Sequence, residues 1–131
     1  MHKSRLAGFI IDCQAEELED AAGFWSAALG YSQKVSTAAE DDNYAVLDTP
    51  PDEVHIELQS VAHESRLHLD IETDNIEAEA CRLERLGARR VKAVRSWLVM
   101  EAPTGHRFCL VNPTRANFAS EANQWDEGDK Q

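Results

Sequence analysis

The sequence contains the same order of predicted elements twice. A strand pattern at 6–13 precedes a helical pattern at 16–30 and a series of short strands, and the order starts again with a strand at 66–72 and a helix at 75–87. An internal duplication of this kind predicts two copies of one module. It argues against a doubly wound parallel sheet, in which helices alternate with every strand.

Each predicted helix has one apolar face and ends at a glycine. Gly30 stops the first helix and Gly87 the second, because glycine readily takes the left-handed conformation that closes a helix. We expect the apolar faces to pack against a sheet. The apolar positions at helical spacing are Leu18, Ala21, Ala22, Trp25 and Leu29 in the first helix, and Ile76, Ala80, Leu83 and Leu86 in the second.

Short β-rich runs complete both halves. In the first half they read NYAVLD and EVHIELQSV, with a weaker strand in SQKVSTA, and in the second half RRVKAV, WLVMEA and HRFCLVN. Each half is therefore predicted to be βαβββ, and the fold class to be α+β.

The strand that opens the second half alternates strictly. Leu67, Leu69 and Ile71 point one way, whereas the intervening polar residues, which include His68 and Asp70, point the other way. We expect the leucines to pack against a helix. The polar side then faces either water or a binding site, and the pattern alone leaves both alternatives open.

Composition excludes several partners. The 131 residues suit one domain, and a formal net charge of −11 argues against binding nucleic acid or an anionic membrane surface. The odd number of cysteines, three without a CxxC pair, favours a reducing compartment. The apolar run near the first residue stops at Asp12, too early for a signal peptide or a membrane span, so we expect a cytoplasmic protein.

The chain resembles the glyoxalase-like branch of the vicinal oxygen chelate superfamily, which includes glyoxalase I, extradiol dioxygenases and bleomycin-resistance proteins. The resemblance covers about residues 5–113 and rests on the two βαβββ halves and on the runs FW…ALG, LHLDIETDNIEAEACRLERLGA and WLVMEAPTGHRFCLVNP. It implies a glyoxalase-like domain at 1–113, with module one at about 5–61 and module two at about 65–113. It also implies that the modules form one open barrel-like domain around a cleft, and that the chain is a homodimer.

The resemblance also implies where metal ligands would lie. In metal-dependent members, four strands each contribute one ligand to the cleft, and two of these positions fall on His68 and Glu57. The other two depart from the pattern, because the first strand has no donor near Gly8 and Cys109 stands where a glutamate is usual. Two alternatives therefore remain. Either His68, Glu57 and Cys109 form a three-ligand site for zinc, nickel, iron or manganese, or the cleft binds no metal.

Each of these residues also has a structural interpretation. Cys109 is typical of a small buried apolar residue. His68 can bond Glu57 or Asp70 without touching any ligand. His55 and Gln59 share a strand face with Glu57, and together with Asp70 they are expected to line the cleft.

The sequence favours a protein that binds a small organic molecule in its cleft, with no cofactor and no complete metal site. One alternative is a metal-dependent lyase, isomerase or dioxygenase acting on vicinal oxygens, with Glu57 as catalytic base. A second alternative is a non-catalytic interaction module. The segment STAAEDDN is a candidate cover for the cleft.

Residues 114–131 are expected to form a polar C-terminal tail with a mobile end. Phe118 and Trp125 in this tail are either incidental or docked on the body or on a partner, and the incidental alternative is the commoner one.

Overall fold

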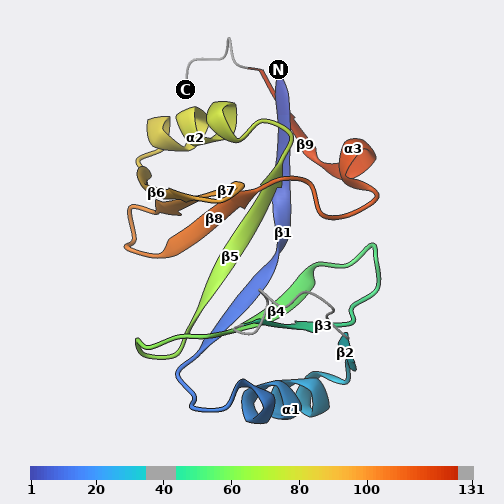
Figure 1. Ribbon diagram of the computed structural model, residues 1–131. Helices are drawn as coiled ribbons and strands as arrows, with labels where there is room; N and C mark the ends of the chain where they lie inside the picture. The colour runs from blue at the N-terminus through green and yellow to red at the C-terminus, as the bar shows by residue number, and fades with distance from the viewer. Residues whose placement is uncertain (35–43, 127–131) are drawn as a thin grey trace. The chain divides into compact units, whose positions relative to one another are not determined.

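The computed structural model describes residues 1–34 and 44–126 (Figure 1). The chain divides into two compact units, one of Gly8–His68 and one of Met1–Ala7 with Leu69–Gln131. We call these the first-half unit and the second-half unit. The predicted cleft cover at 36–43 and the end of the tail at 127–131 lie outside the described residues.

The elements repeat in the predicted order. Within each module the first strand pairs in parallel with the last, β1 with β4 and β5 with β8. In the described residues nine strands form an open sheet in the order β2-β3-β4-β1-β5-β8-β7-β6, with β9 on β1. The predicted α+β class and the two βαβββ modules are thus confirmed. The first module comprises β1 (His2–Cys13), α1 (Leu18–Leu29), β2 (Gln33–Lys34), β3 (Tyr44–Leu47) and β4 (His55–Ser60). The second comprises β5 (Arg66–Thr73), α2 (Ile76–Arg85), β6 (Arg89–Val94), β7 (Trp97–Glu101) and β8 (Arg107–Val111), followed by α3 (Phe118–Glu121) and β9 (Asn123–Trp125).

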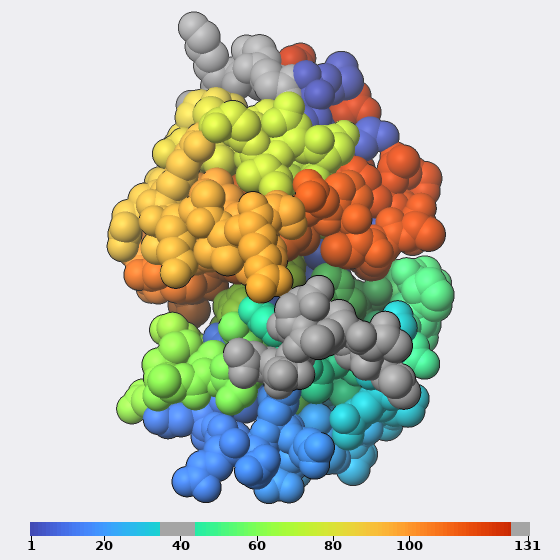
Figure 2. All heavy atoms as spheres, viewed as in Figure 1, coloured from blue at the N-terminus to red at the C-terminus, as the bar shows by residue number. Residues whose placement is uncertain are grey.

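Helix α1 covers one face of β3 and β4 in the first-half unit (Figure 1). Gly30 ends it in the left-handed conformation, with φ of 79°. Four of the five predicted apolar positions pack into the core, but Leu29 is 42% exposed, because it lies in the last turn beside the terminating glycine. The outer side of α1 is at the surface (blue in Figure 2), and Phe24 is exposed there. The core consists of Cys13, Ala22, Leu47 and Leu58, with Ile11, Ala15, Leu18, Ala21, Trp25, Tyr31, Ala45 and Ile56 packed against it.

Helix α2 covers β6 and β8 in the second-half unit. The Asn75 side chain caps it by accepting a hydrogen bond of 3.0 Å from the Ala78 backbone N–H. As in α1, the prediction is wrong at the last apolar position, because Leu86 follows the final helical residue and is exposed. The core consists of Ala80, Met100, Phe108 and Leu110, with Ile71, Ile76, Leu83, Ala88, Leu98 and Ala102 packed against it.

The expectation for the β5 leucines was partly wrong. Ile71 packs into the core of the second-half unit, but Leu67 and Leu69 are 52% and 40% exposed. Alternation gives the side of a strand correctly, but it does not tell how far the covering helix extends along that strand.

No helix among the described residues combines the length and the apolar character needed to cross a membrane.

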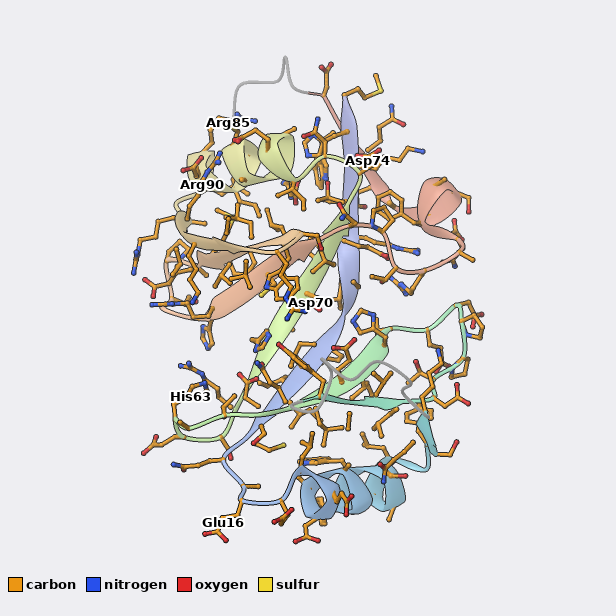
Figure 3. All side chains as sticks on the ribbon, in the orientation of Figure 1. Glu16, His63, Asp70, Asp74, Arg85 and Arg90 are labelled. Carbon is orange, nitrogen blue, oxygen red and sulfur yellow. The ribbon has the colours of Figure 1, made fainter. Side chains whose placement is uncertain are left out.

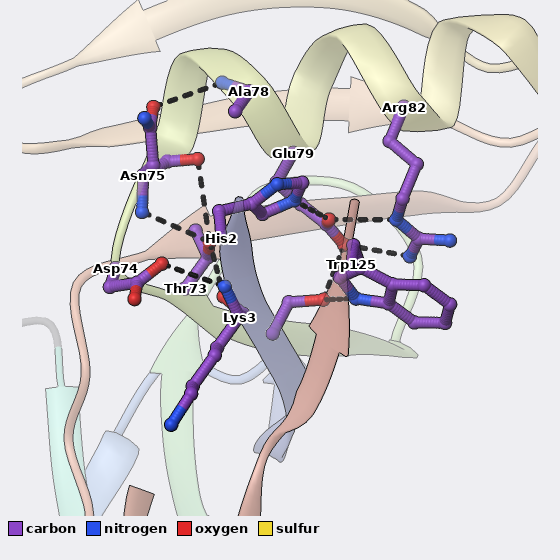
Figure 4. Close-up of polar contacts among 10 residues, drawn as sticks. His2, Lys3, Thr73, Asp74, Asn75, Ala78, Glu79, Arg82 and Trp125 are labelled. Atoms are coloured by element: carbon purple, nitrogen blue, oxygen red, sulfur yellow. Dashed lines mark hydrogen bonds and ion pairs between the residues drawn. The ribbon is translucent and has the colours of Figure 1, made fainter. Parts of the chain in front are cut away.

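A buried carboxylate joins α2 to the beginning of β1 (Figure 4). Glu79 is fully buried and accepts hydrogen bonds of 2.8 Å from both His2 and Ser4. Arg82 adds two bonds of 2.9 Å from its guanidinium group. Burial acts to raise the pKa of Glu79, but the bonds from Arg82, His2 and Ser4 outweigh it and lower that pKa.

The segment after Pro113 docks on the second-half unit. Phe118 is only 6% exposed, and the Arg5 guanidinium lies 5.8 Å from the centre of its ring. The Trp125 indole N–H donates a 2.8 Å hydrogen bond to Ser4, and the Arg82 guanidinium stacks 3.8 Å from the ring centre (Figure 4). Of the two alternatives for these aromatic residues, docking on the body is therefore the one found.

Trp125→Leu should lower the free energy of unfolding by about 1–2 kcal/mol. The change removes a hydrogen bond worth about 1 kcal/mol and a cation–π contact worth about 0.5–1 kcal/mol. Urea unfolding followed by circular dichroism measures the loss. Asn123→Ala, at an exposed position of the same strand, is the matched control and should stay within about 0.5 kcal/mol of the parent. Equal stabilities for the two variants would contradict the docking energy assigned to Trp125.

Candidate functional site

The sheet of the first-half unit has a polar face opposite α1. In the parallel β1–β4 ladder, Gly8 pairs with His55, Ile10 with Glu57, and Asp12 with Gln59, and paired residues project to the same side. The residues between them, such as Ile11 and Leu58, belong to the core under α1. We use the term polar face for the side that carries Gly8, Ile10, Asp12, His55, Glu57, Gln59 and Tyr44.

His68 joins this polar face through Asp12. Its Nδ1 lies 2.9 Å from Asp12 Oδ2, and the two residues are 56 positions apart in the chain. The Asp12 side chain is 4% exposed and the His68 side chain 17% exposed. The Arg66 Nε lies 3.9 Å from the same carboxylate oxygen, but its side chain is 56% exposed. His68 therefore bonds neither Glu57 nor Asp70, the two partners weighed from the sequence.

The second carboxylate oxygen of Asp12, Oδ1, is buried. None of the residues that the structure describes forms a hydrogen bond to it. A buried polar atom left unsatisfied costs about 1–3 kcal/mol, so native proteins keep few of them. Asp12 Oδ1, beside His68, is therefore a candidate acceptor for a hydrogen bond from another molecule.

The remaining polar residues lie along β3 and β4. The Gln59 amide donates a 3.0 Å hydrogen bond to the Tyr44 hydroxyl, which fixes both side chains on the polar face. Glu57 and His55, two and four residues before Gln59 on β4, are half-buried and engaged in interactions of their own. Four of the predicted site residues, His55, Glu57, Gln59 and His68, therefore belong to the first-half unit.

Gly8 explains why the first strand offers no ligand. A Cβ atom built at Gly8 would lie 2.1 Å from the carbonyl oxygen of His55, its neighbour in the ladder. Contacts of this length do not occur between nonbonded atoms, so no residue with a side chain fits here without moving a strand. The β1 backbone therefore packs directly against the β4 backbone at the position where a metal-ligating side chain was expected.

Within the second-half unit, the Asp70 carboxylate lies within 4.8 Å of the Cys109 thiol. Asp70 lies on β5 (Figure 3) and pairs with Cys109 in the parallel β5–β8 ladder. The other two predicted ligands, Glu57 and His68, belong to the first-half unit. Imidazole, carboxylate and thiolate together suit zinc better than iron or manganese, which prefer harder donors.

The Asp12 contact is compatible with such a metal. If Nδ1 of His68 donates to Asp12, its Nε2 is the nitrogen that remains for a cation, as is usual for metal-binding histidines. His68 is therefore oriented as a metal-binding histidine would be, but the first strand adds no donor, because Gly8 leaves no room for a side chain.

Cys13 lies on the opposite side of β1 from the polar face and has a structural environment. It is 6% exposed within the core under α1. Burial, and to a smaller extent the charge of Asp12, raise the pKa of its thiol. A thiol with a raised pKa is a poor nucleophile and a poor ligand, so Cys13 takes no part in the site.

Sequence reasoning missed Asp12. It was noted only as the residue that ends the apolar run of the first strand. The available signal was its period of two with Gly8 and Ile10, which places a carboxylate on the face away from the helix.

Comparison with known proteins identifies the fold. A family model described as a glyoxalase-like domain matches residues 8–111. A methylmalonyl-CoA epimerase structure from Mycobacterium tuberculosis has a TM-score of 0.61 at 18% identity, covering 88% of this chain and 91% of the epimerase. A hypothetical protein from Bacillus halodurans gives 0.63 at 14% identity, with 86% and 96% coverage.

A Streptomyces coelicolor methylmalonyl-CoA epimerase variant, in complex with 2-nitronate-propionyl-CoA, has a TM-score of 0.58 at 17% identity and covers 84% of this chain and 97% of the epimerase. A search of curated proteins finds no match. At these identities the solved structures show the fold alone, whereas the family model extends over most of the chain. The chain belongs to the glyoxalase-like domain family, within the vicinal oxygen chelate superfamily.

Proposed function

We propose that the protein binds a small organic molecule on the polar face of the first-half unit, with Asp12 and His68 as its main polar contacts. The observation that carries the proposal is the buried Asp12 carboxylate: one oxygen bonds His68, and the other has no partner among the described residues. A fold selected for stability alone would replace a buried, half-satisfied carboxylate by an apolar residue. Retaining it is typical of a binding or catalytic site.

Three further features support this function. His68 is partly exposed and so connects the buried carboxylate to solvent. The Gln59–Tyr44 pair adds fixed polar groups to the same face. A few placed polar groups on an otherwise packed scaffold are what small-molecule sites usually contain. The fold neighbours point the same way, since one of them holds a CoA derivative.

Binding can be tested by ligand-observed nuclear magnetic resonance with mixed small fragments. His68→Ala should weaken the bound fragments by about tenfold or more, equivalent to about 1.4 kcal/mol. It should also lower the free energy of unfolding by about 1–3 kcal/mol, because the buried Asp12 Oδ2 loses its hydrogen bond from His68, so binding is compared at a temperature at which both proteins are folded. Asp48→Asn, at an exposed position of the same unit, is the control and should bind as the parent does. Fragments that bind the parent and His68→Ala equally would contradict the proposal.

The contact between Asp12 and His68 favours a second candidate, a zinc-dependent enzyme, because metal-binding histidines usually donate their other ring N–H to a carboxylate. Bound there, zinc would act as a Lewis acid on a substrate oxygen. His68 would be held in place by Asp12, and Glu57 on the polar face would be the candidate base. A non-catalytic interaction module remains the third alternative, and fragment binding at His68 argues against it.

We propose that the chain forms a two-fold homodimer and that its glyoxalase-like domain spans 1–113. The family resemblance supports both statements, and the matched range of 8–111 supports the extent of the domain. Sedimentation of protein at about 10–100 μM, a usual affinity range for modest interfaces, should give twice the chain mass of 14.7 kDa. A monomer throughout that range would contradict the assembly.

A further inference from the structure

We propose that the Asp12–His68 site selects molecules that offer hydrogen-bond donors, either an amidine or guanidine cation or a neutral diol, and rejects carboxylates. The inference rests on the proposed function and names its ligand class. It follows from the two hydrogen-bonding atoms of the pair that remain for a ligand, Asp12 Oδ1 and His68 Nε2.

The contact with Asp12 fixes the tautomer of His68. A carboxylate has no hydrogen to donate, so the 2.9 Å contact between Nδ1 and Asp12 Oδ2 requires the hydrogen to lie on Nδ1. In a neutral imidazole the other nitrogen, Nε2, then carries a lone pair and only accepts. No described residue donates a hydrogen bond to Nε2.

The Asp12 carboxylate leaves a second acceptor. Its Oδ1 is buried, and none of the described residues donates a hydrogen bond to it. Both available atoms of the pair therefore require a donor from the ligand. A ligand with two N–H or O–H groups satisfies both at once, and a charged N–H group forms the stronger bond to a carboxylate.

Anionic ligands are unfavourable at the Asp12–His68 site. A ligand carboxylate would place a second negative charge beside a side chain that is 96% buried, and it would leave both acceptors unpaired. Glu57 adds another carboxylate to the same face, and His55 and Tyr44 are the other titratable groups there. Arg66 is the one described cation near Asp12, and its exposed guanidinium already faces the oxygen that His68 bonds, not Oδ1.

Asp12→Asn gives a test with opposite predictions for the two ligand classes. The amide oxygen can keep the bond from His68, and the amide NH₂ then replaces Oδ1 as a donor. Benzamidine, resorcinol and benzoate are probes of similar size that offer charged donors, neutral donors and anionic acceptors. Titrations of isotope-labelled protein at about pH 8 are followed through the signals of residue 12 and His68.

In the parent protein, benzamidine or resorcinol should shift these signals at millimolar concentration and benzoate should not. The His68 nitrogen shifts should show hydrogen on Nδ1 and none on Nε2. Asp12→Asn should lose about tenfold in affinity for the donor probe and gain affinity for benzoate, whereas Asp48→Asn should match the parent. Benzamidine binding without resorcinol binding would identify the cation as the ligand group, and the reverse would identify the neutral diol.

Two results would overturn the inference. If benzoate binds the parent at His68 more tightly than the donor probes, the site takes acceptors, so the inference is wrong while the proposed small-molecule function stands. A hydrogen found on Nε2 of His68 at this pH would likewise overturn the inference, because that nitrogen would then donate a hydrogen bond instead of accepting one. If none of the probes shifts residue 12 or His68, the inference and the assignment of the site fail together, and Asp12 Oδ1 holds only water.

Discussion

Glu72→Ala should lower the free energy of unfolding by about 3–5 kcal/mol, the usual effect of removing one partner from a buried ion pair. Glu72 is fully buried and accepts five hydrogen bonds within the second-half unit. They come from the Thr114 backbone and hydroxyl, from the Arg115 backbone and guanidinium, and from the Arg5 guanidinium. Without the carboxylate, two guanidinium groups only 11% exposed lose their counter-ion.

Urea unfolding at neutral pH measures this loss. Glu121→Ala, at an exposed glutamate of the same unit, is the control and should change the free energy by about 0.5 kcal/mol at most. A loss from Glu72→Ala no larger than that of the control would show that the cluster contributes nothing to stability.

The same residue sets an acid limit for the parent protein. Burial would raise the pKa of Glu72, but the bonds from Thr114, Arg5 and Arg115 lower it from 4.5 to about 2. Because the folded pKa lies below the unfolded value, the carboxylate stabilises the fold above about pH 4.5, and this contribution is lost as the pH falls toward 2. We expect the free energy of unfolding to fall in that window by less in Glu72→Gln than in the parent.

Gly8→Ala should be destabilising by about 3 kcal/mol, the upper end for overpacked positions. The new Cβ would lie 2.1 Å from the His55 carbonyl oxygen, which is backbone and has no rotamer to change. Strands β1 and β4 would have to separate at this point, which weakens their parallel ladder. Thermal unfolding measured by circular dichroism gives the change.

Gly23→Ala is the matched control for this variant. Gly23 lies inside helix α1 with nothing within 4 Å of its added Cβ, so alanine should stabilise the protein by about 0.5–1 kcal/mol. Opposite signs for the two glycine variants would support the crowded β1–β4 ladder. A neutral Gly8→Ala would contradict it, and would reopen this position to a metal-ligating side chain.

The two modules and their helices could be predicted because their signals are local. Helical spacing and a terminating glycine define α1 and α2 within single segments of sequence. The predictions were wrong at Leu29 and Leu86, which end the apolar patterns of their helices, and at Leu67 and Leu69, which open the pattern of β5; all four side chains are exposed. Periodicity identifies a face, but burial at its ends depends on the packed partner.

The contacts of the site were harder to predict because they join distant segments. Alternation correctly placed His68 on the polar side of its strand, but its partner Asp12 lies on another strand, and no local pattern pairs the two. The docking of Trp125 on Ser4 joins residues 121 positions apart and was undecided for the same reason. Asp70 was named as a cleft residue, yet its alignment with Cys109 depends on the register of β5 and β8.

The central claim is a small-molecule site without a complete set of metal ligands, and metal content tests it most directly. Untagged protein, purified without a nickel column, is analysed for bound metals by elemental mass spectrometry. The melting temperatures of the parent, His68→Ala and Glu57→Ala are measured with and without chelator. We predict clearly less than one transition metal per chain and melting temperatures that do not respond to chelator. One metal per chain in the parent, lost in His68→Ala together with a chelator-sensitive fall in melting temperature, would contradict the account and favour the zinc enzyme.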